Sequence, residues 1–133
     1  IDIRENVVKT NNVNYQSLIT EFIQNNTNSI LEIDEGKVIM EPRNSLLIRL
    51  DMDKKELCLS KSPFRKFLIE ENNTSPKQFV YQMKQNGTTI VEKRKKMASN
   101  WKPGLDEFNV DAYIIDIDTL EKTILKEIDP AIK

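Results

Sequence analysis

The sequence predicts a single α+β domain, and two observations lead to this prediction. Helical stripes and short strand-like runs rich in Val, Ile and Leu are interspersed along the 133 residues. The composition, with 38% hydrophobic and 31% charged residues, suits one modest core better than two full domains. We therefore expect an entry segment at residues 1–12 and one domain over residues 13–133.

The first predicted helix has Asn14 as its N-cap, because apolar side chains from Tyr15 to Ile23 recur at the i, i+3, i+4, i+7 spacing. The Asn-rich segment 25–28 ends this helix, since short amide side chains compete for backbone hydrogen bonds. Three short strands follow, and the last two are expected to form a hairpin. These strands lie at Lys37–Glu41, Ser45–Asp51 and Glu56–Ser60.

Two further helices each begin at a Ser-Pro pair, in which Ser is the N-cap and Pro is the first helical residue. The helix that starts at Ser62 is expected to run to about Glu71. The helix that starts at Ser75 turns Phe79 inward and stops at Asn86-Gly87. These start and stop signals make the Ser75 helix the best-defined element of the sequence.

The remaining elements are a strand, a basic loop, a second strand and a closing helix. A strand at Thr88–Val91 runs into a basic segment, and an apolar strand returns at Val110–Asp118. Thr119 caps the expected closing helix, Leu120–Ile128. Helix, tight turn, helix, strand, basic loop, strand is the order of a winged helix-turn-helix. We therefore predict a winged helix-turn-helix-like domain with an N-terminal helix, a β-hairpin and a C-terminal helix.

The composition excludes several classes of function. Without any His, the chain lacks the Ser-His-Asp and Cys-His nucleophile systems. The only cysteine, Cys58, allows no intrachain disulfide, and three Gly are too few for a phosphate-binding Gly-rich loop. We expect no catalytic residues, no metal and no cofactor. With no export signal and no apolar run of roughly 20 residues, we also expect a cytoplasmic protein that does not enter a membrane.

The charge is unevenly distributed although the formal net charge is only −1. Residues 61–104 contain 10 basic and 3 acidic side chains, whereas residues 105–133 contain 3 basic and 8 acidic ones. The middle third of the chain is therefore the expected site of contact with an anionic partner.

The first candidate site is the basic loop, where several cations on one wing can approach several phosphates at once. The residues are Lys93, Arg94, Lys95, Lys96, Trp101 and Lys102. Trp101 is the candidate for stacking on an unpaired base, although a lone Trp is more often a core or lid residue. The alternative for the cations is a solvated hairpin tip, where lysines deter edge-to-edge strand pairing.

The second candidate site is the outward face of the Ser75 helix. With Phe79 turned inward, Lys77, Gln78 and Gln82 remain for solvent or for a DNA groove. Lys and Gln read base edges, but they are also ordinary residues of a helix surface.

Two Asp-x-Asp pairs have the spacing that places both carboxylates on one face of a strand, as a metal site needs. The pairs are Asp51 with Asp53 and Asp116 with Asp118. A turn and a helix N-terminus explain these acids better. Cys58, which lies between two Leu residues, is expected to be a buried or edge residue and not a reactive thiol.

Several stretches between residues 37 and 118 form a recognisable pattern. They are Glu41-Pro42-Arg43, Leu57–Lys61 leading into Phe64, the Phe79 helix, Lys93–Met97 and Trp101-Lys102. The pattern resembles the C-terminal region of phage and mobile-element replication proteins, in which a primase-polymerase or a superfamily-three-type helicase is followed by a winged-helix-like module. The resemblance implies that polymerase and helicase activities lie in other domains, and that this piece grips DNA or positions subunits around it. A first residue other than Met, Ile1, agrees with a fragment.

We therefore expect a non-catalytic accessory domain that binds single- or double-stranded DNA through the wing and the Ser75 helix. The main alternative is a protein-interaction or oligomerisation module, in which the acidic C-terminal third docks on other domains or subunits of the parent protein. The carboxylates expected at that contact are Asp106, Glu107, Asp111 and Asp116. An enzyme is the third possibility.

Overall fold

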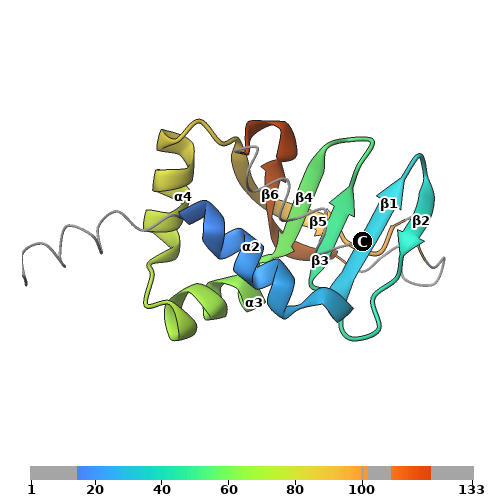
Figure 1. The fold of residues 1–133 in the computed structure, drawn as a ribbon, viewed down its shortest axis with the longest axis horizontal. Coiled ribbons are helices and arrows are strands. Elements are labelled where there is room, and N and C mark those ends of the chain that lie inside the picture. Colours follow the sequence, from blue (N-terminus) through green and yellow to red (C-terminus); the bar gives the residue numbers. More distant parts are fainter. Residues whose placement is uncertain (1–14, 100, 102–108, 121–133) are drawn as a thin grey trace, which may run out of the picture.

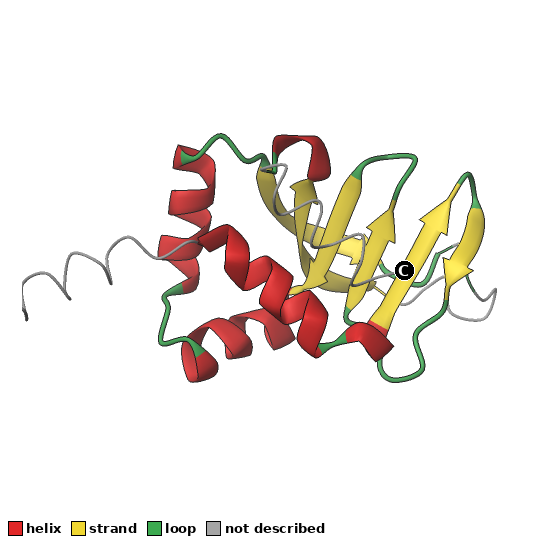
Figure 2. Ribbon diagram, in the orientation of Figure 1, coloured by secondary structure: helices red, strands yellow, loops and turns green. Residues whose placement is uncertain are grey.

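The computed structural model describes residues 15–99, 101 and 109–120, and its fold is α+β, as predicted. A six-stranded mixed sheet is flanked by three helices that lie together on the left in Figure 1. Figure 2 shows the same division between helices and strands. The predicted entry segment, the closing helix after Leu120 and the loop at residues 102–108 lie outside the described residues.

The three helices form where the sequence predicts them. Helix α2 spans Tyr15–Asn25, and helix α3 spans Lys61–Lys66 and continues as a π-helical turn over Phe67–Glu71. Helix α4 spans Pro76–Gln85, and the backbone N–H of Gln78 donates to its N-cap side chain, Ser75. The only departure is that α3 begins just before the predicted cap, Ser62, so that Ser62 lies inside the helix.

The strand order in the sheet is β2-β1-β3-β4-β6-β5. All neighbours are antiparallel except β1 and β3, which are parallel. The β3–β4 hairpin is therefore confirmed. The strands are β1 Ile30–Asp34, β2 Lys37–Met40, β3 Ile48–Asp51, β4 Glu56–Ser60, β5 Ile90–Lys96 and β6 Asn109–Asp116.

Strand β1 is absent from the sequence-based prediction, although it pairs on both sides, between β2 and β3. It joins β2 through a two-residue turn in which Glu35 and Gly36 have φ values of 53° and 75°. Positive φ at both central residues is typical of a tight hairpin turn, and Gly adopts it without strain. The Gly at position 36, between two apolar runs, is the sequence signal of this hairpin, and the sequence-based prediction overlooked it.

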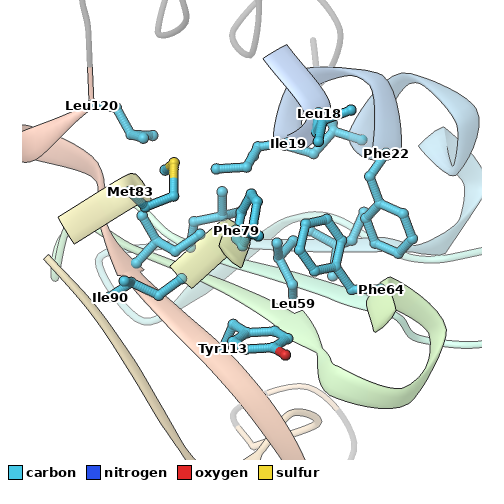
Figure 3. Close-up of a cluster of buried hydrophobic side chains, with 14 of the residues drawn as sticks. Leu18, Ile19, Phe22, Leu59, Phe64, Phe79, Met83, Ile90, Tyr113 and Leu120 are labelled. Atoms are coloured by element: carbon cyan, nitrogen blue, oxygen red, sulfur yellow. The ribbon is translucent and has the colours of Figure 1, made fainter. Parts of the chain in front are cut away.

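The main core lies between the helices and one face of the sheet (Figure 3). Phe64 is fully buried at its centre, with ring centroids 5.0 Å from Phe22, 5.1 Å from Phe79 and 5.7 Å from Tyr113. These three pairs have the edge-to-face arrangement that aromatic rings prefer. Phe64 therefore joins α2, α4 and β6 to the start of α3.

A second, smaller core covers the opposite face of the sheet, around Cys58 and Ile114. The segment after β5 folds back over this face, where Met97 is fully buried. Arg49 on β3 holds it there, because its Nη1 donates to the carbonyl oxygens of Met97 and Ser99. The Nε and Nη2 of Arg49 donate to the carboxylate of Asp51, at 2.9 and 3.2 Å. Strands β1, β3 and β4 are consequently buried on both faces, whereas the edge strands β2 and β5 are largely exposed.

One sequence-based expectation needs correction. The sequence predicts a loop for the basic residues 93–96, but they belong to strand β5, because the antiparallel ladder with β6 continues as far as the pair Lys96 and Asn109. The winged helix-turn-helix-like domain, expected with an N-terminal helix and a β-hairpin, is shown only as an α+β fold, in which β6 pairs with β4 and so joins all six strands in one mixed sheet.

Replacing Phe64 by Ala should lower the free energy of unfolding by roughly 3–5 kcal/mol, the usual cost of deleting a buried Phe ring. Urea denaturation monitored by circular dichroism measures this change. Gln78→Ala, on the exposed side of α4, is the matched control and should change stability by less than about 0.5 kcal/mol. Equal midpoints for the two variants would contradict the central place of Phe64.

Replacing Asp51 by Ala should lower the free energy of unfolding by roughly 3–5 kcal/mol, because it leaves the buried guanidinium of Arg49 without its carboxylate. Asp53→Ala is the control, since Asp53 is exposed in the following turn. Thermal unfolding of both variants tests this prediction. A loss of stability confined to the Asp53 variant would disprove it.

Candidate phosphate-binding groove

The cations of the predicted wing are divided between the two faces of β5. Successive side chains of a strand point to opposite faces, so Lys93 and Lys95 lie on one face and Arg94 and Lys96 on the other. The partner of Lys93 in the ladder is Ala112, which belongs to the smaller core. The strand geometry therefore does not gather these four cations into one cluster.

Two of these cations have acidic partners. Lys95 Nζ lies 3.3 Å from Glu56 Oε1, and Arg94 Nη1 lies 3.3 Å from Asp111 Oδ1. The Arg94–Asp111 pair is mostly exposed, with 61% and 62% of the side chains accessible, so it contributes little to stability and is open to exchange for another anion. Arg94 Nη2 also donates to the carbonyl oxygen of Asn109, at 2.9 Å.

A groove runs between α3 and the β5–β6 hairpin, and we call it the α3–β5 groove. It consists of a larger hollow of about 550 Å³ and a smaller one of about 190 Å³, which share Lys61 and Arg65. Arg94 lines the larger hollow and Lys77 the smaller one. The hydroxyl-bearing residues Ser60 and Ser62 line the larger hollow as well. Four cations from three separate elements thus meet along one depression.

The carboxylates in the groove compensate only part of this charge. Lys61 Nζ lies 2.8 Å from Glu92 Oε1, and Asp111 pairs with Arg94. Among the described residues, Arg65 and Lys77 form no ion pair. The four cations against two carboxylates leave the groove positive and suited to an anionic ligand.

Tyr113 forms the floor of the smaller hollow and connects the groove to the main core. Its ring packs edge-on against Phe64, and Lys61 Nζ lies 6.0 Å from the ring centroid. Burial raises the pKa of the Tyr113 phenol, Glu92 adds to this rise and Arg65 opposes it. Tyr113 is therefore a neutral hydroxyl near neutral pH, on a floor fixed by core packing.

Sequence reasoning singled out Arg94 and Lys77 but missed Lys61 and Arg65. A signal was present, because the two residues are four apart at the start of a predicted helix and so share one helical face. Gln78 is exposed and Gln82 half-buried on α4, and neither lines the groove.

The other candidates lie away from the groove. Trp101 Nε1 donates to Glu41 Oε1 at 2.8 Å, and Lys102 lies outside the described residues. Asp116 accepts a hydrogen bond from the backbone N–H of Asp118 and so caps the 3-10 turn Ile117–Thr119, in keeping with its interpretation as a helix-start residue. Within the described ranges, no three acidic, His or Cys side chains gather as a metal site would need, and no helix has the length and hydropathy to cross a membrane.

Cys58 is fully buried in the smaller core, in agreement with the expectation from its alternating strand. Burial is the main cause that raises the pKa of its thiol from 9.0 to about 12, with nearby Lys95 acting in the opposite direction. Cys58 is thus a protonated packing residue near neutral pH.

Comparison of the chain with models of known families, with curated proteins and with solved structures found no match.

Cys58 should resist alkylation in the folded protein, because its thiol is buried and burial raises its pKa, so that little of the thiolate that attacks alkylating reagents forms. Mass spectrometry after treatment with iodoacetamide at about pH 8 should show no adduct in native protein and one adduct in guanidinium chloride. Rapid labelling of the folded chain would contradict the packing of β4 against β6.

Proposed function

We propose that this chain is a non-catalytic nucleic-acid-binding domain that grips the phosphate backbone in the α3–β5 groove. The observation that carries the proposal is the meeting of Lys61, Arg65, Lys77 and Arg94 along one depression. Lys and Arg side chains that displace counterions from phosphates supply most of the affinity in non-specific nucleic-acid binding.

The exposure of these cations, and their position on regular secondary structure, support the proposal. Arg65 and Lys77 are exposed, and the side chain of Lys61 is 29% accessible. Arg94 is fixed by a strand and Arg65 by a helix, so little ordering of the backbone is needed when a phosphate binds. Ser60 and Ser62, with their hydroxyl groups at the same hollow, are further candidates for contact with phosphate oxygens.

The proposal also retains a winged-helix-like mode of binding within a phage or mobile-element replication protein. The order α3, α4, β5, β6 agrees with it, with α4 as the recognition-like helix and β5–β6 as the wing. The groove moves the expected contact from the wing tip to the side of the β5–β6 hairpin that faces α3, where Arg94 lies, and Lys77 on α4 remains in use. The parent replication protein is inferred from the sequence resemblance alone, and in that setting this domain works beside separate catalytic domains.

A double substitution of groove cations, Lys61→Gln with Arg65→Gln, should weaken DNA binding and reduce its salt dependence. Each phosphate contact contributes roughly 0.7–0.9 to the slope of log K against log salt, so the slope should fall by about 1.5. Fluorescence anisotropy with labelled DNA between about 50 and 200 mM salt measures both effects.

The matched control is Lys37→Gln with Lys54→Gln, which removes the same charge at two exposed sites. Lys37 lies on β2, at the edge of the sheet opposite β5, and Lys54 lies in the β3–β4 turn. We expect this control to bind like the parent chain. The proposal fails if the parent chain does not bind DNA at low salt, or if both double variants lose the same affinity.

A further inference from the structure

Strand β5 lies at one edge of the sheet, and it is accessible along most of its length. Among the described strands, β6 is its only neighbour. All of its residues are exposed except Ile90, which is buried at the start of the strand, and Lys95, which is half-buried. The described part of the chain therefore leaves this edge open to a partner.

The backbone groups that point away from β6 belong to alternate residues of β5. The N–H of Asp116 donates to the carbonyl oxygen of Thr89, at 2.9 Å, and the ladder from Ile90 to Lys96 continues without a shift of register. In a regular antiparallel ladder every second residue bonds to the partner strand, and the residues in between direct both backbone groups outward. The N–H and carbonyl groups of Glu92 and Arg94 consequently lie on the outer edge.

The side chains along this edge carry an excess of positive charge. Four cations follow one another from Lys93 to Lys96, and Glu92, which pairs with Lys61, is the only acid of the strand. Within the described residues, Lys93 and Lys96 form no ion pair. Because they lie on opposite faces of β5, an acidic strand alongside meets an unpaired cation on each face.

We propose that the outer edge of β5 binds an acidic, extended segment of a partner protein, which joins the sheet as a further strand. The backbone of this segment exchanges hydrogen bonds with Glu92 and Arg94, and its carboxylates lie beside Lys93 and Lys96. In this mode of recognition the main-chain hydrogen bonds supply affinity and the side chains supply specificity. The inference goes beyond the proposed function, because it concerns the strand edge and not the α3–β5 groove.

A peptide suits this edge better than a nucleic acid does. The edge offers both N–H donors and carbonyl acceptors, and another strand satisfies both kinds of group. Phosphate oxygens accept hydrogen bonds from the donors but leave the carbonyl groups of Glu92 and Arg94 without a donor. The charge also selects among strands, since like charges across a strand pair repel and opposite charges attract. The cations of β5 thus repel basic strands and favour acidic ones.

Amide hydrogen exchange measured by NMR tests the inference with a synthetic peptide that has a central run of Glu flanked by Val and Thr. We expect the peptide to slow exchange at the amides of Glu92 and Arg94. The amides of Lys93 and Lys95, which point to β6, should change little. The same peptide with N-methyl groups on its central residues keeps the charge but loses the donors, so it should not slow exchange. Unchanged exchange at Glu92 and Arg94 with excess unmethylated peptide overturns the inference.

Fluorescence anisotropy with the labelled peptide then separates the edge from the groove. Lys93→Gln with Lys96→Gln should weaken binding roughly 2- to 30-fold, the effect of losing two opposite-charge pairs between strands. The matched control is again Lys37→Gln with Lys54→Gln, which should bind the peptide like the parent chain.

The groove variant supplies the opposing outcome. A larger loss of peptide affinity for Lys61→Gln with Arg65→Gln than for the β5 variant would place the peptide in the groove and overturn strand addition. DNA binding is measured separately, so failure of the peptide to bind overturns this inference and leaves the phosphate-binding proposal standing. Because Lys93 and Lys96 are exposed, their double variant should keep the circular dichroism spectrum and melting temperature of the parent chain.

Discussion

The buried guanidinium of Arg49 determines the path of the chain on the face of the sheet opposite helices α2, α3 and α4. It binds the carboxylate of Asp51 within β3 and the carbonyl oxygens of Met97 and Ser99 in the segment that follows β5. A buried cation needs most of its five N–H donors satisfied, and a returning backbone supplies acceptors that an apolar covering lacks. The end of β5 is therefore tied to the middle of the sheet, and this tie helps to fix the position of Arg94 opposite α3.

The groove depends equally on the other face of the sheet. Phe64 enters the main core directly after the short segment that carries Lys61, and its ring supports Tyr113 from below. One helical turn thus supplies a core anchor and, on its outer side, the cations Lys61 and Arg65. Such a support restricts the movement of the groove floor, so the spacing of the cations is set largely before a ligand arrives.

The parts of the fold that were predictable are those with local signals. The Ser75 cap, the Pro at the first helical position and the stop at Gly87 define α4 without knowledge of the tertiary structure. Strand β1 carries a weaker signal, since its burial depends on a parallel pairing with β3 and on the turn at Gly36. Of the groove cations, Lys77 and Arg94 were predicted from the sequence, but Lys61, Arg65 and the groove itself were not. Helix α3 and strand β5 come together because β6 packs between β4 and β5, and charge patterning does not reveal this long-range arrangement. The same tertiary context turned the basic segment from a loop into a strand.

The edge position of β5 has a consequence for the behaviour of the protein at high concentration. Among the strands that the structure describes, β5 pairs with β6 alone, so its other side offers backbone hydrogen-bonding groups along seven residues. Two copies that met edge to edge would bring Lys93, Arg94, Lys95 and Lys96 of one chain close to the same cations of the other, and like charges opposite one another destabilise strand pairing. The cations of this strand therefore oppose aggregation through β5, although the net charge of the whole chain is only −1.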